Sequence, residues 1–330
     1  MVGDRWDEAT LEEGLEVWLE NEAAALYGTL AGALDSLPSD QQAVAARRLL
    51  EVAVNLRVAL DGRDTDLDPA WRTLYDTLAS LELVEHPRFR TLSAALAIGT
   101  EAQVVLGYAD AAVRHMDKPL ASLTLEDASG WLAGPMPFQA DGVRGAIGVH
   151  ATDVSAWLQG VLNASAPLST VRIVYRQRAL VDQASSYSTA FRAVAACDVL
   201  VPTLSYDGVE RDDAFAAVDK ALVGASYDLV DEMIAQVTSR SEHEPLARAW
   251  LLWTLSQLFA GCGLDGDATP DAVSAWSAER VEHGDDPRVG RAAWSLLDMA
   301  LFPLANLRSD ASLRRLLGEV AAGGNLGFIT

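Results

Sequence analysis

The sequence predicts a mainly α-helical protein, built as a multi-helix bundle or a stack of helical hairpins. Apolar side chains recur at helical spacing through most of the 330 residues. Prolines and acidic residues stand where successive periodic segments begin, as is typical of helix N-termini. Short connections between these segments favour antiparallel neighbouring helices. Half of the residues are hydrophobic, so the chain can bury a sizeable core.

The first 118 residues are expected to form an N-terminal domain of four helices. In the first, residues 7–37, Leu11, Leu15 and Trp18 keep helical spacing. Pro69 opens the third helix at a position where its missing amide donor costs nothing. The four helices are predicted to begin near residues 7, 39, 69 and 86, and the last is predicted to run to about Met116.

Residues 119–142 differ from the segments on either side of them. Glycines and prolines cluster here around Trp131 and Phe138, a composition typical of a loop or linker. We therefore expect a Gly/Pro-containing bridge over 119–142, followed by a larger helical domain over 143–330.

Residues 143–209 allow two interpretations. An α/β insertion would place strands at 143–150, 170–175 and 199–204, with helices at 152–163 and 180–196 between them. Alternatively, residues 169–197 form one long helix, because their apolar side chains also keep helical spacing. The helical interpretation is preferred because the surrounding segments are helical, and the α/β segment stays open as the alternative.

Helical spacing returns after residue 210. The span 244–260 is apolar on nearly all sides and is expected to be the buried centre of its domain. The predicted helices cover residues 210–223, 226–239, 244–260, 270–282, 286–307 and 310–321.

The charge balance is strongly acidic. Aspartate and glutamate number 47 against 25 lysines and arginines, which gives a net charge of −22, and only two of the 25 are lysines. This balance opposes binding to nucleic-acid backbones or anionic membranes, so nucleic acid is not an expected partner of the chain alone. It also resembles the composition of salt-adapted proteins.

The sequence favours a cytoplasmic location. Its first residues carry neither a basic region nor an apolar run of the kind found in secretion signals. The longest uncharged apolar run, Ala249–Leu264, has 16 residues, too few to span a bilayer comfortably. Two cysteines 65 residues apart (197 and 262) suggest reduced thiols rather than a metal site.

Catalytic motifs are not evident. We find no nucleophile elbow, no phosphate-binding loop with its lysine, and no histidine pair at metal-ligand spacing. No cofactor or metal is therefore predicted. If the α/β interpretation holds, Arg144, Gly145, Gly148 and Asp207 are the candidate ligand-binding residues, near the ends of the expected strands.

These observations favour a non-enzymatic structural or protein-interaction subunit with a protein partner or a second copy of itself. Candidate contact residues are Arg172 and Arg176, which interrupt the acidic pattern, and the apolar tail residues Leu326, Phe328 and Ile329. The alternative is an enzyme or a protein that binds a small ligand or nucleotide, with its site in residues 143–209.

Overall fold

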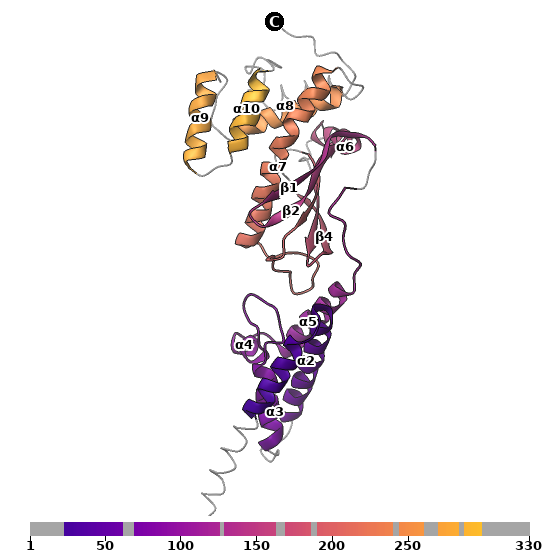
Figure 1. Cartoon of the computed structure of the whole chain (residues 1–330), viewed down its shortest axis with the longest axis vertical. Coiled ribbons are helices and arrows are strands. Elements are labelled where there is room, and N and C mark those ends of the chain that lie inside the picture. The colour runs from indigo at the N-terminus through magenta and orange to yellow at the C-terminus, as the bar shows by residue number, and fades with distance from the viewer. Residues whose placement is uncertain are drawn as a thin grey trace, which may run out of the picture. The chain divides into compact units, whose positions relative to one another are not determined.

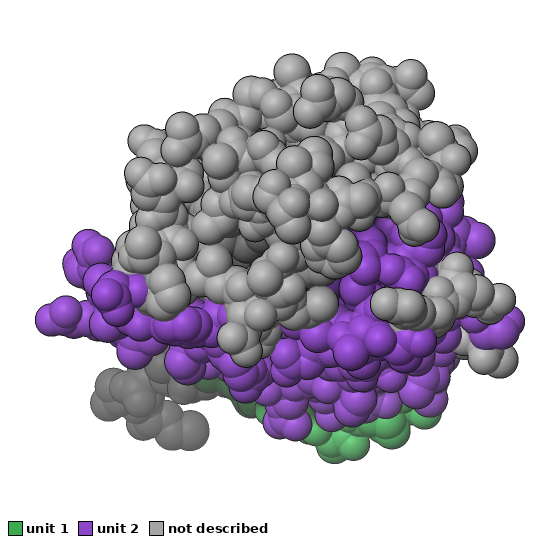
Figure 2. Space-filling view, turned by 90° about the horizontal axis from the view of Figure 1, so that it is seen from above, with its two compact units in different colours: residues 1–119, 201–210 green, residues 120–200, 211–330 purple. Residues whose placement is uncertain are grey.

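The chain divides into two compact units (Figure 2). Unit 1 comprises residues 1–119 and 201–210, and unit 2 comprises residues 120–200 and 211–330. The chain therefore returns to unit 1 for ten residues before it continues in unit 2. The computed structural model describes residues 23–61, 69–125, 129–162, 169–185, 190–239, 244–260, 270–283 and 287–298.

Unit 1 is helical. Residues 23–35 form a helix that precedes α2, Ser39–Asp61, and the next three helices are α3, Pro69–Ser80, α4, Leu92–Ala97, and α5, Ala102–Met116. The single helix predicted over 86–116 is wrong. Thr91 caps a new helix by accepting a hydrogen bond from the Ala94 amide at 3.1 Å, and Gly99, at φ +82°, ends that helix.

An aromatic cluster lies in unit 1 and includes a residue from the returning segment. The Tyr206 ring lies 5.3 Å from the Tyr108 ring and 5.3 Å from the His115 ring. The Tyr108 hydroxyl donates a hydrogen bond to the Glu85 carbonyl at 2.5 Å, and the His86 ring lies edge-on to Tyr108 at 5.4 Å. Residues 201–210 thus contribute to the core of unit 1.

His86 should make the stability of unit 1 depend on pH. Burial lowers the pKa of His86, and this outweighs the opposing charge of Glu210. As pH falls below about 6.5, the unfolded chain takes up a proton that the folded unit resists. The contribution of neutral His86 to the free energy of unfolding is therefore fully present above that pH. Below it, this contribution declines by at most about 1.4 kcal/mol per pH unit. We expect His86→Phe to flatten this part of the pH profile, measured as urea denaturation midpoints. An unchanged slope in the variant would contradict this assignment.

Unit 2 is built around a five-stranded mixed sheet, so the prediction of a mainly α-helical, all-α protein is wrong. The strand order is β1-β2-β5-β3-β4, with β3 and β5 parallel and every other pair antiparallel. The strands are β1, Trp131–Ala140, β2, Val143–His150, β3, Ser169–Tyr175, β4, Arg178–Ser185, and β5, Arg192–Ala196.

The sheet corrects both interpretations of the middle of the chain. Residues 169–197 are not one helix, because they contain β3, β4 and β5. β2 and β3 coincide with two strands of the α/β alternative, but its helix at 180–196 is replaced by strands and its strand at 199–204 is absent. β1 lies inside the expected bridge at 119–142. It is an edge strand, where Pro135 and Pro137 need not donate to a neighbouring strand.

Helices complete unit 2 (Figure 1). α7 contacts β1, β2 and β5, and joins the two helices predicted at 210–223 and 226–239 into one. Asp212 caps it by accepting a hydrogen bond from the Phe215 amide at 2.9 Å. Among the described helices, none is long and apolar enough to cross a membrane. The helices are α6, Ala151–Leu162, α7, Asp213–Thr238, α8, Glu244–Ala260, α9, Pro270–Glu282, and α10, Pro287–Asp298.

Candidate functional site: an arginine-bearing face of the sheet

The strand register places three arginines on one face of the sheet. Residues directly opposite each other on paired strands share a face, as do alternate residues along one strand. Arg144 and Gly148 share a face of β2, and Gly148 is opposite Arg192 of β5. Val194, two residues further along β5, is opposite Arg172 of β3. We call this side the arginine face, defined by Trp131, Arg144, Gly148, His150, Thr170, Arg172, Asp182 and Arg192.

The opposite side of the sheet is covered. Val143, Ile147 and Val149 of β2 point away from the arginine face and are 0% exposed. α7 contacts β1, β2 and β5. The sheet thus has one buried, apolar side and one side that carries charged residues.

A short apolar segment covers the centre of the arginine face. Four small side chains there form a buried cluster, and Ala121, Leu123 and Leu125 pack against it while remaining partly exposed. The segment 120–125 is held to the sheet where the Ala121 amide donates to the Gln177 carbonyl at 2.8 Å. Leu120, at the start of the segment, is 68% exposed. The clustered residues are Ala146, Val174, Val194 and Ala196.

Arg172 and Asp182 form an exposed ion pair across neighbouring strands. Nε of Arg172 donates to one carboxylate oxygen of Asp182 at 2.7 Å, and Nη2 donates to the other at 2.9 Å. These hydrogen bonds lower the pKa of Asp182. Both side chains are about half exposed, so the pair contributes at most about 1 kcal/mol to stability.

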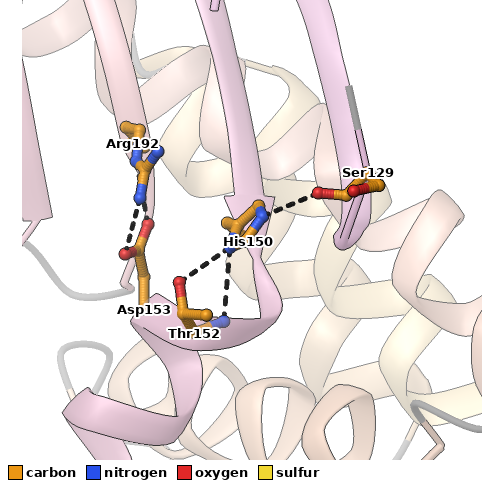
Figure 3. A network of polar contacts seen from close by, with 5 residues as sticks. All are labelled: Ser129, His150, Thr152, Asp153 and Arg192. Carbon is orange, nitrogen blue, oxygen red and sulfur yellow. Dashed lines mark hydrogen bonds and ion pairs between the residues drawn. The ribbon is translucent and has the colours of Figure 1, made fainter. Parts of the chain in front are cut away.

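Arg192 makes a second, more buried pair at one end of the face (Figure 3). Its guanidinium donates to Asp153, in the first turn of α6, at 3.1 and 2.9 Å. The same guanidinium lies 5.9 Å from the centre of the Trp131 ring. Arg192 therefore joins β5, α6 and β1 and has a structural role.

His150 lies beside this pair and closes the junction between β2 and α6 (Figure 3). Its Nε2 lies 2.9 Å from the Ser129 carbonyl, which can only accept, so Nε2 carries the proton. Nδ1 accepts from the Thr152 amide at 3.3 Å and lies 2.8 Å from the Thr152 hydroxyl. Both ring nitrogens are thus engaged within the fold, in an arrangement suited to holding the chain rather than to proton transfer.

Arg144 differs from the other two arginines. Its side chain is exposed and forms no ion pair or hydrogen bond among the residues that the structure describes. The surrounding segment is also unusual in charge: residues 129–200 contain five arginines and four aspartates, a net charge of 5 − 4 = +1. The rest of the chain carries −22 − 1 = −23. The face thus offers a cation to an incoming carboxylate.

The residues predicted as a ligand site are not all brought together. Arg144, Gly145 and Gly148 lie on β2, whereas Asp207 belongs to unit 1. The two glycines are within this strand. Asp207 accepts hydrogen bonds from the hydroxyls of Ser205 at 2.5 Å and Thr203 at 2.9 Å, which lower its pKa and shape the turn.

The predicted contact residues are placed differently from the expected helix face. Arg172 lies in β3, and Arg176 lies in the turn after it at φ +46°, with its guanidinium 5.4 Å from the centre of the Tyr175 ring. The tail residues lie outside the described part of the chain. Sequence reasoning missed Asp153 and Asp182 as arginine partners, and only the register of the sheet could have identified Asp182.

No three His, Cys, Asp or Glu side chains gather as metal ligands do anywhere in the ranges described. No family model matches the chain, and no curated protein or solved structure matches it either.

Proposed function

We propose that this chain is a non-enzymatic interaction subunit, which binds a carboxylate-rich protein surface through its arginine face. The observation that carries the proposal is Arg144, an exposed cation with no partner among the described residues of a chain that has 47 acidic residues. In such a chain, the repulsion between like charges favours spreading carboxylates over every surface. A side of the sheet that has a local surplus of arginine is therefore suited to an acidic partner.

The other ionisable groups of the face support binding rather than chemistry. Asp182 and Asp153 are bound to arginines, and His150 holds the junction between β2 and α6. A general base must be able to reach a proton of its substrate. These three groups already have partners that position the strands and α6.

The test compares proteins captured from an extract of the source cells by three forms of the full chain. Arg144→Glu reverses the charge of the side chain on which the proposal rests. Arg72→Glu is the matched control, since Arg72 is also exposed and has no ion pair among the described residues, but belongs to unit 1. We expect one protein to be retained by the wild type and by Arg72→Glu, and lost with Arg144→Glu.

Two outcomes would overturn the proposal. The first is an identical set of captured proteins for all three forms. The second is calorimetric binding of a small anion such as ATP that Arg144→Glu abolishes, because this would assign the face to a small ligand.

A further inference from the structure

The arginine face and the N-terminal end of the chain are complementary in charge. Residues 1–22 contain eight acidic residues and one arginine, a net charge of 1 − 8 = −7. We infer that a second copy of this chain is a partner, and that its residues 1–22 bind the arginine face. This inference rests on the proposed function. Each copy then both supplies and receives an acidic segment.

The sequence of residues 1–22 has the two kinds of side chain that the face can accept. Leu11, Leu15 and Trp18 recur at helical spacing, and in a helix Glu8 and Glu12 lie along one edge of that apolar stripe. Protein interfaces commonly surround an apolar centre with charged groups, and a tryptophan is often the strongest single contact.

The face offers matching groups. Leu120 is 68% exposed, and Leu123 and Leu125 cover the centre of the face while remaining partly exposed. Arg144 and Arg172 lie on either side of β5, which separates their strands. An apolar stripe over the segment 120–125 would therefore bring the glutamates along its edge close to an arginine of the face.

The existing ion pair does not prevent this contact. The Arg172–Asp182 pair is half exposed, so a second carboxylate can approach the Arg172 guanidinium at small cost in free energy. Arg144 has no described partner to lose. Two chains of net charge −22 repel each other at long range, but at about 0.15 M salt this repulsion is screened beyond about 8 Å, while contact pairs persist.

The experiment measures the mass of the full chain by light scattering over a range of protein concentrations at about 0.15 M potassium chloride. We expect the wild type and Arg72→Glu to associate alike. Arg144→Glu and Glu8→Arg should each need at least about ten times more protein to reach the same degree of association. Combining Arg144→Glu with Glu8→Arg should restore at least part of the association, because the pair is then re-formed with its charges exchanged. Circular dichroism confirms that each variant is folded.

A labelled peptide of residues 1–22 gives an independent measurement. It should bind the full-length wild type, and bind Arg144→Glu at least about ten-fold more weakly. A peptide with Glu8→Gln and Glu12→Gln should also bind the wild type more weakly.

The inference is overturned if the wild type remains a single chain and the peptide does not bind. It is equally overturned if association is the same in Arg144→Glu as in the wild type. If, in either case, extracts still yield a protein whose capture depends on Arg144, the proposed function stands and only the identity of the partner is wrong.

Discussion

Replacing Trp250 with alanine should lower the free energy of unfolding of unit 2 by about 3–5 kcal/mol. The Trp250 side chain is 1% exposed, and its Nε1 donates a hydrogen bond to the Ala190 carbonyl at 2.7 Å. This contact joins α8 to the residues that lead into β5. The substitution would leave a cavity and would also deprive a buried carbonyl of its donor.

One further variant separates the cavity from the lost hydrogen bond, and a second serves as a surface control. Trp250→Phe keeps most of the ring but removes the donor, so we expect a smaller loss of about 1–3 kcal/mol. Trp71→Ala, at a side chain that is 49% exposed, should change stability by at most about 1 kcal/mol. Urea denaturation followed by circular dichroism provides the measurement. Equal losses for Trp250→Ala and Trp71→Ala would show that Trp250 is not the core anchor described above.

Gly145→Ala should destabilise unit 2 by about 3 kcal/mol or more, although it adds only one methyl group. A Cβ atom at this position would lie 1.8 Å from the Val194 carbonyl oxygen and 3.1 Å from the Phe138 ring. The obstacle on the β5 side is backbone, so a change of rotamer cannot relieve it. β2 and β5 would have to separate at the centre of the sheet.

Gly107→Ala is the matched control. Apart from the adjoining backbone of its own helix, no described atom lies within 4 Å of the Cβ position at Gly107, which is exposed and within α5. Alanine there should stabilise unit 1 by about 0.5–1 kcal/mol. Thermal melts of both variants, measured beside the wild type, provide the comparison. If Gly145→Ala melts at or above the wild-type temperature, the close approach of β2 and β5 is not as described.

The helices were the more predictable part of the fold, since local signals mark where they begin. Pro69 and Pro270 stand at the first residues of α3 and α9, where proline is favoured. The strands depend on tertiary pairing instead. β4, with the sequence RALVDQAS, contains several good helix formers and becomes a strand through its pairing with β3. Pro135 and Pro137 favoured a loop where the structure has β1. Proline is tolerated at the edge of a sheet, and the sequence alone does not identify which strand is at the edge.

The candidate site was predictable only in parts. Arg144 and Arg172 were both singled out, but as members of two different sites. Their common face follows from the pairing of β5 with both β2 and β3, and that pairing joins residues about 20 to 50 positions apart. Gly145 was a candidate ligand-binding residue, whereas in the structure it serves the close approach of two strands.

The return of residues 201–210 to unit 1 has a consequence for biosynthesis. Tyr206 packs against Tyr108 and His115, so the core of the first unit lacks one of its rings until the ribosome has passed residue 206. Domains generally fold in order as they emerge during translation. In this chain, all five strands of the sheet are synthesised before Tyr206 is available to complete the core of the N-terminal unit. Nascent chains arrested before residue 201 should therefore be more sensitive to proteases in unit 1 than chains arrested well beyond residue 210, once that segment has left the exit tunnel.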